Sequence, residues 1–433
     1  MQNREKDSAS QTAIPGTFLE YLKSLGPGIV VVLTWLGAGD IVDSSVAGGN
    51  YGYALMWVLV LAAIVRFVFV SLIAKYQLCN PNGETVVDGL VRLHPWFAPF
   101  LIVASVVMAH VYGAFMLVGC GEACAKLTGR GATWQWSLVW VVAALGLVFR
   151  PVYRRIETVF KIILAVLSVA LIGSAIWAGP DPAGILQGVF AFSLPEKVGA
   201  FGASLVAVSM IGALGGSMMN LAYPYFMELK GWRGPAYRRV QTFDLLLGVL
   251  IMILLNLAVW TLGAEVIHGT DRSVSNLDGL VLVLGEVLGP WGERLLLIGV
   301  FSAVFTSYVG ISMVLSLIAD QSVRHWRGDV TTARADATSS TVYRSVALWA
   351  LISPLVWTLP GMPGFVTLTV IGNGLQVPLV PILAGGLWRI TASERFIGRE
   401  YRNNICENLV MLLTFSLAVW ASIELVRSIL PGT

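Results

Sequence analysis

Two aspartates that follow an apolar run near the start of the chain carry the side chains best suited to chemistry. Asp40 and Asp43 come directly after the small residues Gly37, Ala38 and Gly39. An aspartate at the centre of a bilayer costs roughly 2.5 to 3.5 kcal/mol on insertion scales unless a partner compensates its charge. On a helix, carboxylates at positions i and i+3 lie on one face. The pair therefore predicts a cation site, with Asp40 as the stronger candidate ligand.

A structural role is the alternative for both carboxylates. Asp40 would then cap a helix that begins after the glycines, and Asp43 would lie in its first turn, where a negative charge suits the helix dipole. The two roles are compatible, because a residue at a helix start can also bind an ion.

A second set of candidate ligands lies in the middle of another apolar run, between Gly212 and Asn220. Gly216 offers a backbone carbonyl, Asn220 an amide oxygen, and Met219 a thioether. Oxygen ligands suit hard ions such as Mg²⁺, whereas thioethers favour softer ions. We therefore expect a metal site formed by residues of both segments, namely Asp40, Asp43, Gly216, Met219 and Asn220.

The elements that position these residues are helices interrupted at their middles. Glycine costs about 1 kcal/mol in a helix interior and proline about 3 kcal/mol, so the glycine clusters and Pro224 predict unwound backbone. Such backbone is tolerated at membrane depth only where it lines a cavity or is buried in protein. Close helix packing through small residues is the alternative reading of the glycines.

The composition places these helices in a membrane. Of the 433 residues, 56% are apolar and 12% are charged, which excludes a water-soluble enzyme, a disordered scaffold and a nucleic-acid binder. No zinc-binding His-Glu-x-x-His pattern suggests an enzyme. Runs long enough to cross a bilayer predict about eleven transmembrane helices in an all-α polytopic protein, at residues 26–49, 52–78, 98–126, 134–150, 156–179, 198–229, 242–268, 291–323, 341–359, 363–390 and 404–430.

The interruptions fall in the first and sixth runs, which divides the chain into two units of five helices at residues 26–179 and 198–390. Five is odd, so the second unit is inverted relative to the first, as in secondary transporters whose broken helices meet at mid-membrane. Residues 1–25 then form an N-terminal segment, and residues 404–430 form an additional helix.

The distribution of basic residues gives the orientation. With the N-terminus inside, 21 of the 28 Lys and Arg residues lie on the cytoplasmic side and six on the other, and Arg66 lies within the second run. Basic residues resist translocation. We expect a multi-pass protein of the cell membrane with a cytoplasmic N-terminus and an external C-terminus.

Several segments resemble the natural resistance-associated macrophage protein (Nramp) family of divalent-metal transporters, from Gly26 to the last span. The matches are Gly26-Pro27-Gly28, Tyr51-Gly52-Tyr53, Asp244 with Asn256, Leu288-Gly289-Pro290-Trp291-Gly292 and Leu375-Gln376-Val377-Pro378. The resemblance implies a LeuT-like inverted repeat with broken helices 1 and 6.

This chain departs from the family pattern at the positions where the family binds its metal and moves protons. The family's first-helix motif Asp-Pro-Gly-Asn matches Gly37, Ala38, Gly39 and Asp40. Its sixth-helix motif Met-Pro-His matches Met219, Asn220 and Leu221, and the register of this second match is uncertain by one residue. The family's acidic residues of the third helix match Val107 and His110, and its sixth-helix histidines match Leu221 and Phe226. These departures are similar to the Nramp-related magnesium transporters, in which the site is rebuilt and proton coupling is absent.

A physical argument agrees with that resemblance, because Mg²⁺ keeps several waters and needs only one or two carboxylates. We expect a secondary transporter that moves Mg²⁺, and also Mn²⁺, into the cell by alternating access without obligatory proton coupling. It would act as a monomer, with the ion as substrate and no resident cofactor. The alternatives are a proton-coupled Mn²⁺ or Fe²⁺ transporter of the classical type, an amino-acid transporter on the same fold, and a non-transporting receptor or scaffold.

The remaining polar residues of the spans are expected to be structural. Asp244 and Asn256 should brace helices through hydrogen bonds, and His110 should be a satisfied packing residue. Glu122 should reach the interface or pair with Lys126 at i+4.

Overall fold

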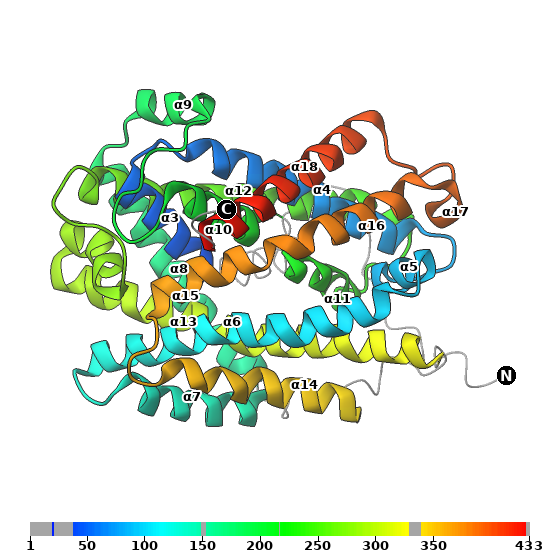
Figure 1. Ribbon diagram of the computed structural model, residues 1–433, viewed down its shortest axis with the longest axis horizontal. Helices are drawn as coiled ribbons and strands as arrows, with labels where there is room; N and C mark the ends of the chain where they lie inside the picture. Colours follow the sequence, from blue (N-terminus) through cyan, green and yellow to red (C-terminus); the bar gives the residue numbers. More distant parts are fainter. Residues whose placement is uncertain (1–19, 21–37, 149–152, 216, 329–338, 430–433) are drawn as a thin grey trace.

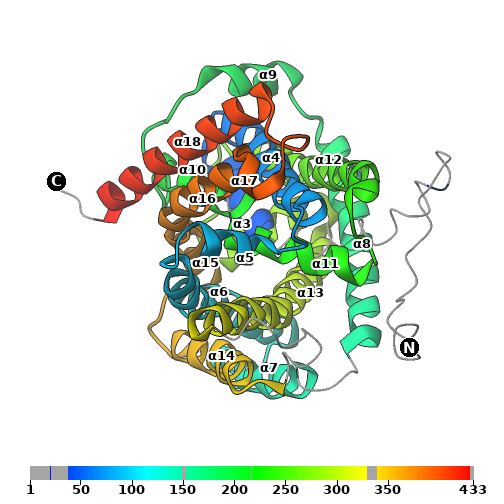
Figure 2. The same ribbon diagram turned by 90° about the vertical axis from the view of Figure 1, so that its right-hand side faces the viewer.

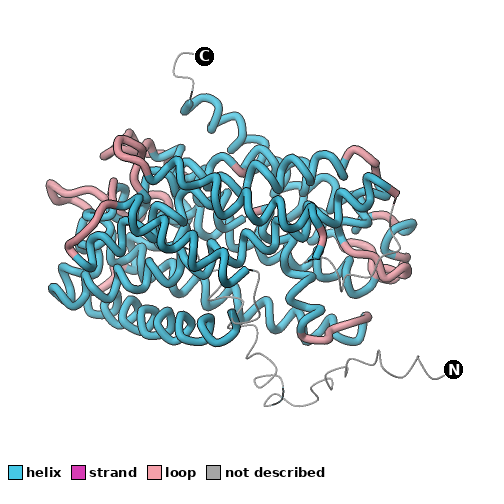
Figure 3. The backbone as a smooth tube through the Cα atoms, turned by 90° about the horizontal axis from the view of Figure 1, so that it is seen from below, coloured by secondary structure: helices cyan, strands magenta, loops and turns pink. Residues whose placement is uncertain are grey.

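A computed structural model describes residues 20, 38–148, 153–215, 217–328 and 339–429. These residues are almost entirely helical, and loops gather at the two ends of the bundle (Figure 3). The longer helices are α3 (Ala38–Tyr51), α4 (Met56–Cys79), α5 (Val86–Leu93), α6 (Phe97–Thr128), α7 (Thr133–Val148), α8 (Tyr153–Ala178), α9 (Pro182–Ala191), α10 (Ala203–Met210), α11 (Tyr223–Leu229), α12 (Arg238–Leu262), α13 (Leu277–Arg327), α14 (Thr341–Ile352), α15 (Phe365–Leu375), α16 (Val380–Ala392) and α18 (Ile405–Ile429).

Each predicted span corresponds to a helix or a broken pair of helices in the described residues. Seven of these segments are long and apolar enough by themselves to cross a membrane, and α8 with α9 forms a further apolar pair bent by 104°. The first span is described only from Ala38 onward. The rest of that span, and all of the predicted segment 1–25 except residue 20, lie outside the described residues.

The sixth span is broken, as its glycines predict. Helix α10 ends at Met210 and continues as a π-helical turn (Ile211–Gly215), and a 3₁₀ turn (Met218–Ala222) leads into α11. An added Cβ on Gly212 would lie 2.0 Å from the carbonyl oxygen of Asn373. Only glycine therefore allows the π turn to approach α15 so closely.

The tenth span is also broken, whereas the sequence predicted a continuous run over 363–390. Helix α15 ends at Leu375, a 3₁₀ turn covers Val377–Leu379, and α16 begins at Val380. Pro378 lacks a backbone N–H and cannot continue the α-helical hydrogen bonds of α15. A third interruption lies in α13, where Gly289 has φ 61° and ψ −151° ahead of Pro290, so the eighth span starts at that kink.

Two groups of helices lie side by side along the long axis of the molecule (Figure 1). Helices α6 and α13 pack together along their lengths with α7 and α14 against them, while α12 packs on α3 and α4. Seen from the α5 end, α3 lies in the interior of the molecule (Figure 2). Every residue from Gly39 to Tyr51 is buried, so the carboxylates of α3 are far from bulk water.

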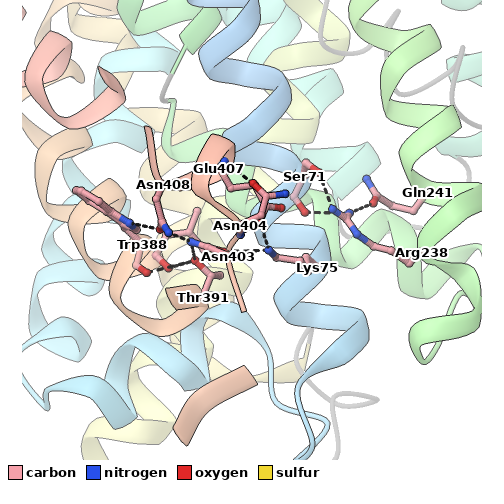
Figure 4. A network of polar contacts seen from close by, with 11 residues as sticks. Ser71, Lys75, Arg238, Gln241, Trp388, Thr391, Asn403, Asn404, Glu407 and Asn408 are labelled. Carbon is pink, nitrogen blue, oxygen red and sulfur yellow. Dashed lines mark hydrogen bonds and ion pairs between the residues drawn. The ribbon is translucent and has the colours of Figure 1, made fainter. Parts of the chain in front are cut away.

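A polar network joins α4, α16, α12 and the start of α18 (Figure 4). Lys75 Nζ donates to Asn403 Oδ1 at 2.9 Å and pairs with Glu407 Oε2 at 2.7 Å. Asn403 Nδ2 donates to Thr391 Oγ1 at 2.9 Å, and Arg238 Nη1 donates to the Ser71 carbonyl at 3.0 Å. These contacts hold the last helix and the start of α12 against α4.

Candidate metal site

A cavity of about 110 Å³ lies where the two broken helices meet α3, α4, α6 and α13. One water occupies roughly 30 Å³ in the liquid, so the cavity has room for a small ion with part of its hydration shell. Its polar and sulfur-bearing lining residues are Asp40, Arg66, Tyr112, Met116, Ser217, Met219, Asn220, Ser307, Asn373 and Gln376.

Asp40 is the carboxylate that lines this cavity. It lies on α3, within the first described residues of that helix. The residue is 4% exposed, and its Oδ2 makes no hydrogen bond within the described part of the chain. Buried polar atoms nearly always have a partner, so the unpaired oxygen makes Asp40 the candidate ligand of this cavity.

Asp43 is placed differently from the sequence expectation that both carboxylates face one ion. Ser209 Oγ donates to its Oδ1 at 2.7 Å, and Asn373 Nδ2 donates to its Oδ2 at 2.9 Å. The residue is fully buried and is not among the described residues that line the cavity. Its carboxylate therefore joins α3 to α10 and α15.

The break of the sixth span contributes Met219 and Asn220, which both line the cavity. Asn220 Nδ2 donates to the Gly215 carbonyl at 3.2 Å, which braces the π turn. Its amide oxygen is the group that a cation in the cavity could take as a ligand. Gly216, the predicted carbonyl ligand, lies outside the described residues.

A chain of hydroxyl and amide groups connects the two broken helices across the cavity. Tyr112 on α6 donates from its hydroxyl to Gln376 Oε1, and the same hydroxyl lies 3.2 Å from Ser217 Oγ. Sequence reasoning missed these three residues as members of the site. The available indication was the sequence Leu375-Gln376-Val377-Pro378, where a polar residue and a proline interrupt an apolar run.

Arg66 is the second charged group in the cavity, and its role was also missed. The residue is 4% exposed and lines the cavity together with Asp40, and its Nη1 lies 3.1 Å from Met252 Sδ. One acidic and one basic side chain thus line the same cavity. Within the described chain, no group of three or more His, Cys, Asp or Glu residues could hold a metal ion, so any ion here has few charged ligands.

The structural roles expected for Asp244, Asn256 and His110 are confirmed. Asp244 pairs with Lys230 at 3.0 Å, and Asn256 Oδ1 accepts from Ser44 Oγ at 2.7 Å. His110 Nδ1 lies 2.9 Å from Ser353 Oγ, and Trp357 Nε1 donates to His110 Nε2 at 2.9 Å.

Of the two alternatives expected for Glu122, reaching the interface or pairing with Lys126, the ion pair does not form within the described residues. Glu122 Oε1 accepts from the Phe365 backbone N–H at 3.1 Å, and Lys126 pairs with Asp278.

Solved structures similar to this chain share its fold. A manganese transporter of Eremococcus coleocola, in complex with an aromatic bis-isothiourea substituted compound, has a TM-score of 0.74 and 15% identity, covering 99% of this chain and 90% of that one. MhsT in complex with L-phenylalanine has a TM-score of 0.54 and 16% identity, covering 93% of this chain and 98% of that one. These likenesses confirm the predicted all-α, LeuT-like fold.

Two of the curated relatives illustrate the names that these proteins carry, which are those of metal transporters. The divalent metal cation transporter MntH of Bacillus subtilis is 24% identical over 327 residues, which is 70% of this chain and 72% of that protein. Metal transporter Nramp1 of Oryza sativa subsp. japonica is 23% identical over 416 residues, 89% of this chain and 74% of that protein. The family model described as natural resistance-associated macrophage protein-like matches residues 28–428, and the chain therefore belongs to the Nramp family.

Proposed function

We propose that this chain transports divalent cations, Mg²⁺ before Mn²⁺, by alternating access around the cavity between its broken helices. The observation that carries the proposal is Asp40, a buried aspartate that lines a cavity with room for water and whose Oδ2 makes no hydrogen bond within the described part of the chain. The names of the relatives, divalent metal cation transporter and manganese transporter, support a divalent cation as substrate.

The preference for Mg²⁺ follows from the small number of protein ligands. Mg²⁺ dehydrates reluctantly and is held by one or two carboxylates while it keeps several waters. Among the lining residues, Asp40 supplies one carboxylate and Asn220 a neutral amide oxygen. The thioether of Met219 is soft enough to admit Mn²⁺ as well.

Transport without obligatory proton coupling is the second part of the proposal. The positions that resemble the family's proton-linked residues hold Val107, His110, Leu221 and Phe226. Both ring nitrogens of His110 have partners on the segment after α14, and His110 is not among the described cavity residues. No carboxylate or imidazole of the described cavity lining other than Asp40 is therefore available to carry a proton beside the ion.

In the proposed orientation, the end that carries α5 faces the cytoplasm, ions enter the cell, and the monomer is the working unit in the cell membrane. The tenth and first spans then provide the moving walls of the site, because alternating access rocks one group of helices against the other.

Ion uptake into proteoliposomes tests the proposal. Mg²⁺, Mn²⁺ and Ca²⁺ are supplied separately while a lumenal dye reports pH. We expect uptake of Mg²⁺ and weaker uptake of Mn²⁺, each without acidification of the lumen. Mn²⁺ uptake that resists excess Mg²⁺ and acidifies the lumen in proportion would instead establish the classical proton-coupled alternative.

One observation favours the amino-acid alternative enough to test it in the same vesicles. Arg66 presents a guanidinium and Asp40 a carboxylate to one cavity, which is the charge pattern that an amino acid's two ends would need. Uptake of a mixture of radiolabelled amino acids, with no flux of any divalent ion, would replace the cation proposal with this one.

A further inference from the structure

The buried guanidinium of Arg66 is unexpected in a site that would receive a divalent cation. Arginine remains charged in proteins and offers only donors. Its contact with Met252 Sδ, at 3.1 Å, joins it to a weak acceptor on α12. Like charges in a cavity of low dielectric repel strongly, so a site built only to bind cations would exclude this side chain.

The charged side chains that line the cavity give Arg66 a role in transport. Among the described residues that line it, Asp40 is the acidic group and Arg66 the basic group, so the lining holds one charged group of each sign. The Asp43 carboxylate, outside this lining, is held by Ser209 and Asn373. Without Arg66, the carrier would have to return through its cycle with an uncompensated carboxylate at mid-membrane, which is costly. A carrier that uses protons can neutralise such a carboxylate by protonation, but a carrier without protons needs another cation.

We infer that Arg66 is a built-in counter-cation for Asp40, which neutralises the empty site and so allows the unloaded carrier to reorient without a proton. The inference rests on the proposed function. When a divalent ion arrives, it takes the place of the guanidinium as the partner of the Asp40 carboxylate. The repulsion that remains between the ion and Arg66 keeps binding weak and promotes release.

The inference separates two modes of transport that can be measured in the same vesicles. Net uptake into ion-free vesicles requires the empty carrier to return. Exchange of external labelled ion for internal unlabelled ion does not require that step, because the site is loaded in both directions. Loss of the counter-cation must therefore slow net uptake more than exchange.

The experiment compares wild type with Arg66→Gln and Arg66→Lys, using ⁵⁴Mn²⁺ for both modes and titration calorimetry with Mn²⁺ for binding. We expect Arg66→Gln to lower net uptake by about tenfold or more, to leave exchange within about threefold of wild type, and to bind Mn²⁺ about tenfold more tightly. Arg66→Lys keeps the charge and should retain net uptake. Equal loss of both modes in Arg66→Gln, or weaker Mn²⁺ binding, would overturn the inference.

Lys75→Gln is the matched control, because Lys75 is a buried basic residue of the same helix that pairs with Glu407 and is not among the described cavity residues. Its ratio of exchange to net uptake should equal that of wild type, even if its stability falls. A shifted ratio in this control would show that removing any buried charge from α4 produces the effect, and the inference would fail.

Wild-type protein provides a measurement that does not depend on folding of a variant. If Arg66 neutralises the empty site, internal Mn²⁺ should accelerate uptake of labelled Mn²⁺ by no more than about twofold, because the empty return step is not limiting. Acceleration by about tenfold would contradict the inference. Absence of any flux in wild type would instead contradict the proposed function, so the two failures are distinguishable.

Discussion

Asn373 Nδ2 on α15 donates a 2.9 Å hydrogen bond to Asp43 Oδ2 on α3, across 330 residues of sequence. The other oxygen of Asp43 accepts from Ser209 on α10. Asp40, one helical turn earlier, lines the cavity, and its Oδ2 makes no hydrogen bond within the described residues. Two carboxylates of one helix thus have different tasks, since Asp43 holds the broken helices together and Asp40 faces the space between them.

Replacing each aspartate by asparagine, which has the same shape but no charge, should separate the structural role of Asp43 from the ion-binding role of Asp40. In Asp43→Asn, the new amide can accept from Asn373 through its oxygen and donate to the hydroxyl oxygen of Ser209 through its nitrogen, so uptake should stay within about threefold of wild type. In Asp40→Asn the charge is lost while Arg66 remains, so Mg²⁺ uptake should fall by about tenfold or more. Initial rates in proteoliposomes with equal protein content measure both variants. Equal losses at the two positions would show that Asp43 also acts on the ion.

Substitution at Gly310 should test whether the ion is hydrated in the cavity. Gly310 lines the cavity, and an added Cβ there meets nothing within 4 Å. The methyl group of Gly310→Ala fills roughly the volume of one water. Mg²⁺ uptake should therefore fall several-fold, and more than Mn²⁺ uptake, because Mg²⁺ gives up its waters less readily.

Gly146→Ala is the control for Gly310→Ala. Gly146 lies on the exposed face of α7, also with nothing within 4 Å of an added Cβ, and alanine is the better helix former. Its uptake of both ions should match wild type. If Gly310→Ala lowers Mn²⁺ uptake as much as Mg²⁺ uptake, the hydrated-ion interpretation is wrong.

Met219 should affect selectivity more than overall rate. Met219→Leu conserves side-chain volume, which costs little in packing, but removes the thioether from the break of the sixth span. Mn²⁺ affinity should fall by roughly threefold to tenfold with Mg²⁺ affinity unchanged, since only the softer ion gains from sulfur. Met116→Leu, in another methionine of the same cavity, is the comparison. An equal change in both variants would rule out Met219 as a specific ligand.

The spans and the break in the sixth helix could be predicted because their causes are local. Glycine and proline destabilise a helix wherever they occur, and Gly212, Gly215 and Pro224 lie within one apolar run. The break in the tenth helix was missed although Pro378 is visible in the sequence. Its 3₁₀ turn spans only Val377–Leu379, so the apolar run continues through it and looks like one helix.

The roles of Arg66 and Asn373 could not be predicted because they depend on which helix faces which. Helix α4 is apolar for most of its length and its few polar residues form no continuous stripe, so the sequence does not indicate which side faces the interior. Arg66 could therefore be assigned to a span but not to a cavity. Asn373 reaches Asp43 only after α15 has packed against the π turn. The division into units at 26–179 and 198–390, and the membrane orientation, stay predictions.

Asp88 on α5 is hydrogen-bonded to α13, and this contact should make the thermal stability of the protein depend on pH. Its Oδ1 lies 2.6 Å from His325 Nε2 and accepts from Gln321 Nε2 at 2.7 Å. Burial favours a higher pKa for Asp88, but hydrogen bonds from His325, Thr85 and Gln321 outweigh it and hold the pKa below its usual value. A carboxyl with a lowered folded-state pKa stabilises the protein fully above its unfolded pKa of about 3.9, and this contribution is lost as pH falls through the folded-state value.

Asp88→Asn should therefore melt roughly 2 °C or more below wild type at pH 7, and the difference should shrink as the pH falls below about 4. Thermal unfolding in detergent, followed by tryptophan fluorescence at several pH values, measures the difference. Asp278→Asn is the control, because Asp278 forms an exposed ion pair with Lys126 and such pairs contribute little. A difference between wild type and Asp88→Asn that stays constant down to pH 3 would contradict the assignment, because protonation removes the advantage of the carboxylate over the amide.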